Sequence, residues 1–154
     1  KDVLVKCDHI DQNGEKGTLC GDGLKLSYRH SAYYDNGCTI TGVYFKLKKG
    51  NPDEIKSKMQ DLMGRRKSKQ PLEFASAGST FKRPEGYFAG ALIEECNLKG
   101  TTIGGAQVST KHAGFVINTG GATCNDVLAL CKQVSDTVYK EKGVRLEMEV
   151  RVTK

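Results

Sequence analysis

The stretch that decides the fold runs from Pro71 to Thr123 and reads PLEFASAGSTFKRPEGYFAGALIEECNLKGTTIGGAQVSTKHAGFVINTGGAT. Apolar residues recur at helical spacing from Gly86 to Leu98, which predicts an amphipathic helix. From Lys99 to Gly121 the chain alternates short β-rich runs with glycines, which is typical of short strands joined by turns. A helix beside several short strands predicts an α+β fold for this part of the chain.

The residues that follow predict a second helix and a closing strand. A capping box opens a helix at Thr123, and Gly143 ends it. From Val144 to Val152 apolar residues alternate with charged ones, the pattern of a strand with one buried face. Because the composition shifts to glycine and small residues after Gln70, we expect two domains, 1–70 and 71–154. The second should be an α+β domain of short strands and two helices.

The first domain is expected to be rich in β-structure. Val3–Ile10 and Thr39–Leu47 read as strands, and an Asn-Gly turn follows the first of them. The polar run Tyr28–Ser31 lies between them and predicts a loop or short helix. Asn51 then caps a helix with one apolar stripe, which runs to the basic residues before Gln70. Such a basic run complements the helix dipole or serves an anion site.

The composition excludes several classes of protein. The chain has 154 residues, 38% of them hydrophobic and 27% charged, which is the balance of a globular protein, and no apolar run spans a bilayer. The net charge of +6 comes from lysines spread along the chain, so a solvated surface or an anion site is favoured over nucleic-acid binding. The six cysteines lack zinc-ligand spacing and are expected to be reduced, in a cytoplasmic protein. Without an initiator Met, the chain is expected to be cut from a longer one.

Two glycine-containing segments stand out as candidate sites. In the first, Ser79 follows two small residues, so a ligand can approach the backbone closely, and it precedes the cations Lys82 and Arg83. An ordinary Gly-Ser turn is the alternative. The second, Lys99–Ala106, is rich in glycine but fits neither the P-loop nor the dinucleotide pattern, so it predicts no nucleotide site.

Two charged positions are the other candidates. Arg29 is able to stabilise a developing oxyanion in a dry site, although a single arginine in a loop is more often a surface residue. Glu149 lies between Glu147 and Arg151 on the polar face of the closing strand. It is an acid/base candidate if it faces a pocket and a surface ion pair otherwise.

Taken together, these segments resemble the UDP-N-acetylenolpyruvoylglucosamine reductase family, in its shorter form. The resemblance covers the whole chain and is strongest from Pro71 to Thr123. It rests on the following motifs in this order: YRHS (28–31), AGSTFKRP (77–84), LKGTTIGG (98–105), KHAGFVIN (111–118) and LEMEVR (146–151).

The resemblance implies a cytoplasmic flavoprotein oxidoreductase of peptidoglycan synthesis. In this family NADPH reduces FAD, and UDP-N-acetylglucosamine enolpyruvate is then reduced to UDP-N-acetylmuramate. Matched motif by motif, Ser79 is the expected proton donor, Arg29 the oxyanion stabiliser and Glu149 the carboxylate that supports protonation. The anionic substrate also requires cations, and Arg65, Lys69, Lys82 and Lys99 are the expected substrate-binding residues.

The same resemblance implies that the chain is the C-terminal portion of the enzyme, with residues 1–70 as the tail of the flavin domain. The cofactor-binding residues are then mostly upstream of Lys1, and the missing N-terminal flavin domain is a partner. We expect no metal, no nucleic acid, no membrane and a monomeric full-length enzyme. Alone, the chain should neither hold FAD nor turn over, and its β-segment should expose an apolar face. The alternatives are a non-catalytic module that binds an anion or nucleotide-sugar, and a plain α+β structural domain.

Overall fold

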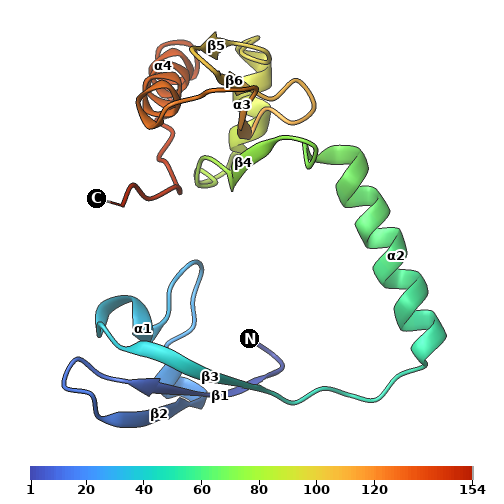
Figure 1. Ribbon diagram of the computed structural model, residues 1–154, viewed down its shortest axis with the longest axis vertical. Coiled ribbons are helices and arrows are strands. Elements are labelled where there is room, and N and C mark those ends of the chain that lie inside the picture. Colours follow the sequence, from blue (N-terminus) through green and yellow to red (C-terminus); the bar gives the residue numbers. More distant parts are fainter. Residues whose placement is uncertain (154) are drawn as a thin grey trace. The chain divides into compact units, whose positions relative to one another are not determined.

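The computed structural model describes residues 1–153 and divides the chain into two compact units, Lys1–Ile55 and Lys56–Lys154 (Figure 1). The expected domain boundary after residue 70 stays a prediction. All six cysteines are free thiols. Across residues 1–153, every helix is too short or too polar to cross a membrane.

The first unit is built on a three-stranded antiparallel sheet in the order β2-β1-β3. The hairpin between the first two strands turns at Asp11, whose side chain accepts hydrogen bonds from the backbone N–H groups of Asn13 and Glu15, both at 2.8 Å. The two expected strands are confirmed, and short helices form in the segment between them. The elements are β1 (Leu4–Ile10), β2 (Lys16–Cys20), the 3₁₀ helix η1 (Gly21–Leu24), α1 (Ala32–Asp35) and β3 (Thr39–Phe45).

This unit buries little apolar surface. Only Cys7 and Leu24 of its hydrophobic residues are fully buried among those described. The expected exposure of apolar residues is confirmed, and the exposed side chains are those of Val3, Val5, Tyr28, Tyr34, Ile40, Val43, Tyr44, Phe45, Leu47 and Ile55. Exposed apolar groups at this density mark a surface suited to further contacts.

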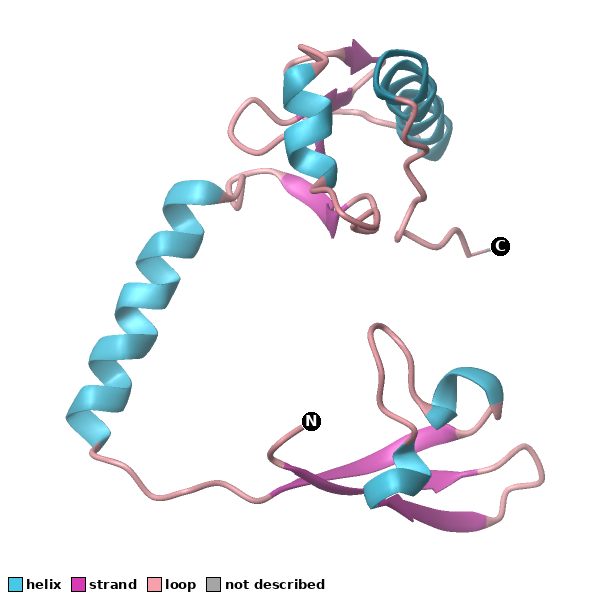
Figure 2. Ribbon diagram, turned by 180° about the vertical axis from the view of Figure 1, so that it is seen from behind, coloured by secondary structure: helices cyan, strands magenta, loops and turns pink. Residues whose placement is uncertain are grey.

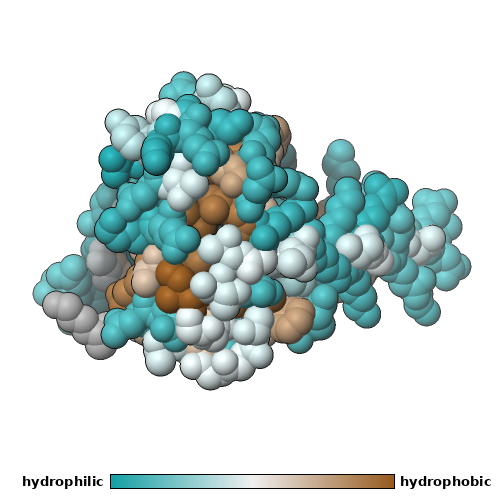
Figure 3. Space-filling view, turned by 90° about the horizontal axis from the view of Figure 1, so that it is seen from above, coloured by the Kyte–Doolittle hydropathy of each residue, from teal (hydrophilic) through white to brown (hydrophobic). Residues whose placement is uncertain are grey.

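Helix α2 (Pro52–Lys69) confirms the expected helix. Its first turn is held by the Asn51 side chain, which accepts a hydrogen bond from the Asp53 N–H at 2.9 Å. The helix buries none of its residues, and each residue of the apolar stripe, which includes Met59 and Leu62, is about half exposed or more. In the space-filling view, hydrophobic residues appear as small patches on a mainly hydrophilic face (Figure 3).

The second unit packs two helices against a four-stranded antiparallel sheet in the order β4-β7-β6-β5 (Figure 2). Helix α4 contacts strands β5 and β6 as well as helix α3. The elements are β4 (Ala75–Ser79), α3 (Ala89–Glu95), β5 (Thr102–Ile103), β6 (Ala106–Val108), β7 (Phe115–Asn118) and α4 (Cys124–Lys142). This mixture of short strands and two helices confirms the expected α+β fold. Their buried residues include Ile93, Ala106, Val116, Leu130, Val134 and Val138.

Both ends of α4 are those that the sequence predicts. The Thr123 hydroxyl accepts a hydrogen bond from the Asp126 N–H at 3.1 Å, and the Asp126 carboxylate accepts one from the Thr123 N–H at 2.8 Å. This reciprocal pair is a capping box. At the other end Gly143 adopts φ +70°, and its N–H donates to the Tyr139 carbonyl.

The expected strand from Val144 to Val152 is wrong. In this segment the structure has only an isolated antiparallel bridge, between Phe81 and Met148. An alternating pattern becomes a strand only where a partner offers a run of backbone groups. Here two hydrogen bonds flank the bridge, one from the Lys82 N–H to the Glu147 carbonyl and one from the Glu149 N–H to the Thr80 carbonyl. The pairing stops there because the next donor needed from the opposite segment is at Pro84, which has no N–H.

Candidate functional site

Ser79 ends strand β4 immediately after a β-bulge. Strand β4 pairs Ser76 with Ile117 of β7 and then Ser79 with Phe115, so β4 carries one residue more than its partner. Gly78 takes up the extra length at φ +88°, a conformation that glycine adopts without strain. A bulge redirects the side chain that follows it, and here the Ser79 side chain is exposed.

Glu149 lies on the segment paired with the residues that follow Ser79. Its backbone N–H donates to the Thr80 carbonyl at 2.9 Å, and the Lys82 N–H donates to the Glu147 carbonyl at 2.8 Å. One carboxylate oxygen of Glu149 is buried. The structure therefore brings the regions of Ser79 and Glu149 together on adjacent, hydrogen-bonded segments.

Two of the expected substrate-binding cations lie in the second unit, and each is paired with a carboxylate. Lys82 forms an ion pair with Glu147, and Lys99 forms one with Glu94 at 2.5 Å. Both pairs are partly exposed, so each contributes little to stability and leaves its lysine within reach of an anion.

The other two expected cations lie near the C-terminal end of α2. Arg65 pairs with Asp61 one turn earlier at 2.9 Å, and Lys69 is the last residue of the helix. Both are exposed. Basic residues at this end also complement the negative pole of the helix dipole, so the structure is compatible with either role.

Arg29 belongs to the first unit and has an unusual backbone conformation. It lies in a tight turn in which the Ser27 N–H donates to the His30 carbonyl at 3.1 Å. Its φ is +55°, in the left-handed region, which costs a residue other than glycine about 1–2 kcal/mol. Its guanidinium is 5.7 Å from the ring centre of Tyr28. Strain at an exposed arginine in a turn is an observation from which a functional role is reasonably inferred.

The glycine pair of the segment 99–106 serves packing. A Cβ on Gly105 would lie 2.3 Å from the Gly120 carbonyl oxygen and 2.4 Å from the Ala122 nitrogen. A Cβ on Gly104 would lie 2.5 Å from the Asp126 carboxylate, and Gly104 has φ +53°. These glycines let the β5–β6 turn approach the start of α4, which explains their presence without a ligand.

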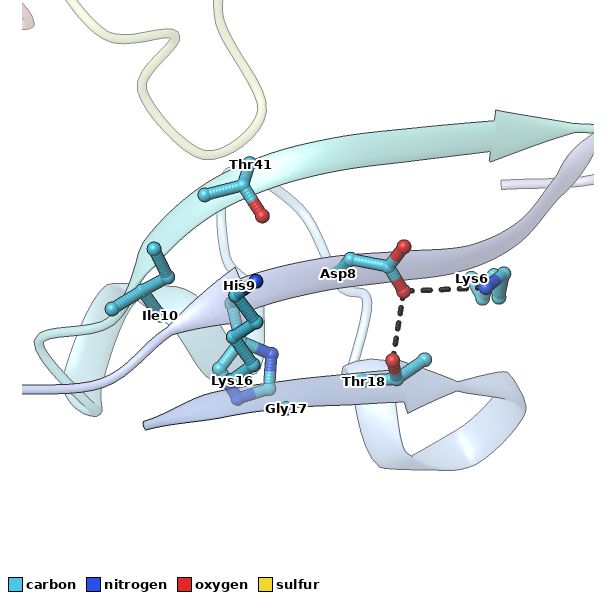
Figure 4. Close-up of a pocket in the computed structure, with 8 residues that line it drawn as sticks. All are labelled: Lys6, Asp8, His9, Ile10, Lys16, Gly17, Thr18 and Thr41. Carbon is cyan, nitrogen blue, oxygen red and sulfur yellow. Dashed lines mark hydrogen bonds and ion pairs between the residues drawn. The ribbon is translucent and has the colours of Figure 1, made fainter. Parts of the chain in front are cut away.

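The first unit also has an open groove of about 500 Å³ on its sheet, which the sequence did not predict (Figure 4). Asp8 lines it and accepts hydrogen bonds from Thr18 at 2.7 Å and Lys6 at 3.3 Å. Hydrogen bonding from Thr18, then from Tyr44 and Lys6, holds the pKa of Asp8 below its usual value. The remaining lining residues are His9, Ile10, Lys16, Gly17 and Thr41.

Comparison with known proteins gives a consistent result. The family model described as "UDP-N-acetylenolpyruvoylglucosamine reductase, C-terminal domain" matches residues 70–153. Proteins named UDP-N-acetylenolpyruvoylglucosamine reductase are 51% identical over 152 residues in Agathobacter rectalis and 53% identical over 150 residues in Clostridium novyi. These matches cover 99% and 97% of this chain, but 48% and 49% of the relatives. The chain thus spans about half the length of the curated relatives that it matches.

A solved structure agrees with this comparison. The crystal structure of UDP-N-acetylenolpyruvylglucosamine reductase from Thermus caldophilus superposes with a TM-score of 0.81 at 34% identity. The match covers 97% of this chain and 53% of that one.

Proposed function

Since the chain belongs to the UDP-N-acetylenolpyruvoylglucosamine reductase family, we propose that it supplies the substrate-binding and proton-donating part of such a reductase. The complete enzyme, a cytoplasmic monomer, reduces the enolpyruvyl ether of UDP-N-acetylglucosamine to the lactyl ether of UDP-N-acetylmuramate, for peptidoglycan synthesis. FAD, itself reduced by NADPH, supplies the hydride when it is bound.

The described residues do not fit the flavin's pyrophosphate at the one place where a glycine-rich turn precedes a long helix. There the start of α4 is closed by the Thr123 hydroxyl, and the Asp126 carboxylate would repel a phosphate. We therefore assign none of these residues to the pyrophosphate of the flavin.

We assign two roles to this chain, to stabilise the negative charge that forms on the substrate and to protonate the substrate. Addition of hydride to the vinyl carbon leaves negative charge at C2 and on the adjoining carboxylate. A cation stabilises this anion, and a proton donor neutralises it by protonating C2. We assign the cation to Arg29, the proton donor to Ser79 and a supporting carboxylate to Glu149.

A serine hydroxyl is a weak acid in water, so its role requires charged neighbours. Lys82 lies on the segment that follows Ser79, where its side chain pairs with Glu147, and we assign to it the positive charge that favours the alkoxide left behind by proton transfer. Reprotonation of the serine then requires a group that relays a proton, which is the role of Glu149.

The observation that carries this proposal is the hydrogen bond between the Glu149 N–H and the Thr80 carbonyl. It ties the segment that carries the Glu149 carboxylate to Thr80, the residue after Ser79, although Glu149 and Thr80 are 69 positions apart in the chain. Separate segments that meet next to a bulge are a typical setting for catalytic groups. Lys82 and Lys99, with Arg65 and Lys69, are proposed to bind the diphosphate and carboxylate of the substrate.

The test is Ser79→Ala in the full-length enzyme. Loss of a general acid is expected to lower kcat for product formation by about 10²- to 10⁴-fold. Reduction of the flavin by NADPH should be preserved, because it does not require this proton. Ser76→Ala, an exposed serine in the same strand, is the matched control and should retain activity. Unchanged product formation by Ser79→Ala would refute the acid role and favour a non-catalytic module that binds the nucleotide-sugar.

A further inference from the structure

Thr80 lies where three chain segments meet, and it is hydrogen-bonded to both of the other two, the stretch that includes β7 and the C-terminal segment. Its N–H donates to the Gly114 carbonyl at 2.9 Å, and its carbonyl accepts from the Glu149 N–H at 2.9 Å. Its side-chain oxygen accepts from the Val116 N–H at 3.0 Å. The residue is only 3% exposed, which is rare for a threonine among the described residues.

The side-chain bond compensates for the bulge in β4. Between the pairs Ser76–Ile117 and Ser79–Phe115, two residues of β4 face the single residue Val116. A bulge interrupts the backbone ladder, so a buried N–H at that point needs another acceptor. The Thr80 hydroxyl is that acceptor, and it fixes how far β4 is displaced along β7.

The pairing with the C-terminal segment places Thr80 beside Glu149. Because Phe81 is bridged to Met148 in an antiparallel pair, Thr80 lies directly opposite Glu149. Opposite residues in such a pair share a face, and both Thr80 and one carboxylate oxygen of Glu149 are buried.

We propose that Thr80 is a positioning residue that sets the Ser79 hydroxyl and the Glu149 carboxylate in register for proton delivery to the substrate. The proposal rests on the proposed function, which gives Ser79 and Glu149 their roles. Thr80 touches neither substrate nor flavin in this scheme. It acts through Ser79, its neighbour in the chain, and through Glu149, whose N–H is bonded to the Thr80 carbonyl. A shift of about 1 Å in such groups is sufficient to lower a rate by about 10²-fold.

The test compares three variants of the full-length enzyme. Thr80→Val keeps the shape but removes the acceptor for Val116, and kcat is expected to fall about 10- to 100-fold with little change in KM. Thr80→Ser keeps the hydroxyl and should restore kcat to within a few-fold of the unaltered enzyme. Val134→Ala removes buried volume from α4 but leaves the hydroxyl acceptor of Val116 in place, and serves as the control for lost stability alone.

A second measurement does not depend on turnover. Amide hydrogen exchange of Val116 should be faster in Thr80→Val than in Thr80→Ser, because only the serine variant keeps the acceptor. If Thr80→Val is destabilised but keeps its kcat, as expected of Val134→Ala, then Thr80 is merely structural and the proposal is overturned. That outcome differs from failure of the proposed function, in which Ser79→Ala itself would retain product formation.

Discussion

Replacing Gly105 by alanine adds a methyl group where the backbone leaves no room. The new Cβ would lie 2.3 Å from the Gly120 carbonyl oxygen, 2.4 Å from the Ala122 nitrogen and 2.8 Å from the Ala122 Cα. All three are backbone atoms, so no side chain is able to rotate away. The Gly105 carbonyl is also held, because it accepts hydrogen bonds from the Thr119 N–H at 2.9 Å and from its hydroxyl at 3.0 Å.

The magnitude follows from these contacts. Overpacking of a core position costs about 1–3 kcal/mol. Moving the Gly105 backbone away from residues 120–122 to relieve the clash would strain or break the two hydrogen bonds from Thr119, at a cost of about 0.5–1.5 kcal/mol each. We therefore expect Gly105→Ala to lower the free energy of unfolding by about 2–6 kcal/mol.

The assay is urea unfolding followed by circular dichroism. With a urea dependence of about 2 kcal/mol per molar, the midpoint should fall by roughly 2 M. The matched control is Gly64→Ala in α2, where a Cβ meets nothing within 4 Å. It replaces an exposed helical glycine and should stabilise the helix by about 0.5–1 kcal/mol. A midpoint for Gly105→Ala within about 0.3 M of that of the unaltered chain would show that the packing argument is wrong.

Three further outcomes are expected. The hydrogen bonds from Thr123 lower the pKa of Asp126 in the folded chain. The ionised carboxylate therefore stabilises the fold above its unfolded pKa near 3.8, and this stabilisation is lost as the pH falls through the lower folded pKa. Asp126→Asn should therefore reduce the loss of unfolding free energy measured between about pH 5 and 2. Arg29→Asn places a residue that tolerates positive φ in the strained turn, so the free energy of unfolding measured by thermal denaturation should change by less than about 1 kcal/mol. Turnover of the full-length enzyme should be lost, and retained turnover would contradict the role of Arg29. Glu147→Gln removes the carboxylate that pairs with Lys82, and the KM for the anionic substrate should fall about two- to five-fold at unchanged kcat, whereas a rise in KM would show that the ion pair positions the lysine for binding.

The sequence predicts those elements whose causes are local. Helix α4 is the clearest case, because its capping box and its final glycine define both ends within the helix's own sequence. Strands β1 and β3 were also predicted from local patterns, β1 from its alternating apolar positions and β3 from its β-branched and aromatic residues. Helix α3 was predicted as an element but is shorter than the range Gly86–Leu98, since it begins at Ala89 and ends at Glu95.

The failures come from causes that lie elsewhere in the chain. The alternation from Val144 to Val152 is a genuine strand pattern, but the extent of its pairing is set by the segment opposite, which the pattern does not reveal. The apolar stripe of α2 predicted a helix correctly, but not that the stripe would be exposed.

The candidate site shows the same division. Ser79, Arg29 and Glu149 were selected through motifs, and their roles remain predictions. Thr80 was missed because a threonine in a Gly-Ser-Thr run looks like part of a turn. Its burial arises only because β4 carries an extra residue relative to β7, and that mismatch is visible only when both strands are aligned.

The bulge in β4 makes the length of a four-residue stretch as important as its composition. Side chains of a strand alternate between two faces, so adding or removing one residue between Ser76 and Ser79 exchanges inside and outside for every position that follows. Such an insertion or deletion would act on the site as several simultaneous substitutions, turning Ser79 inward and Thr80 outward. In an alignment of relatives, a single-residue gap at this point therefore deserves the weight normally given to a changed catalytic side chain. A redesign of the strand has to fix the number of its residues before it chooses their identities.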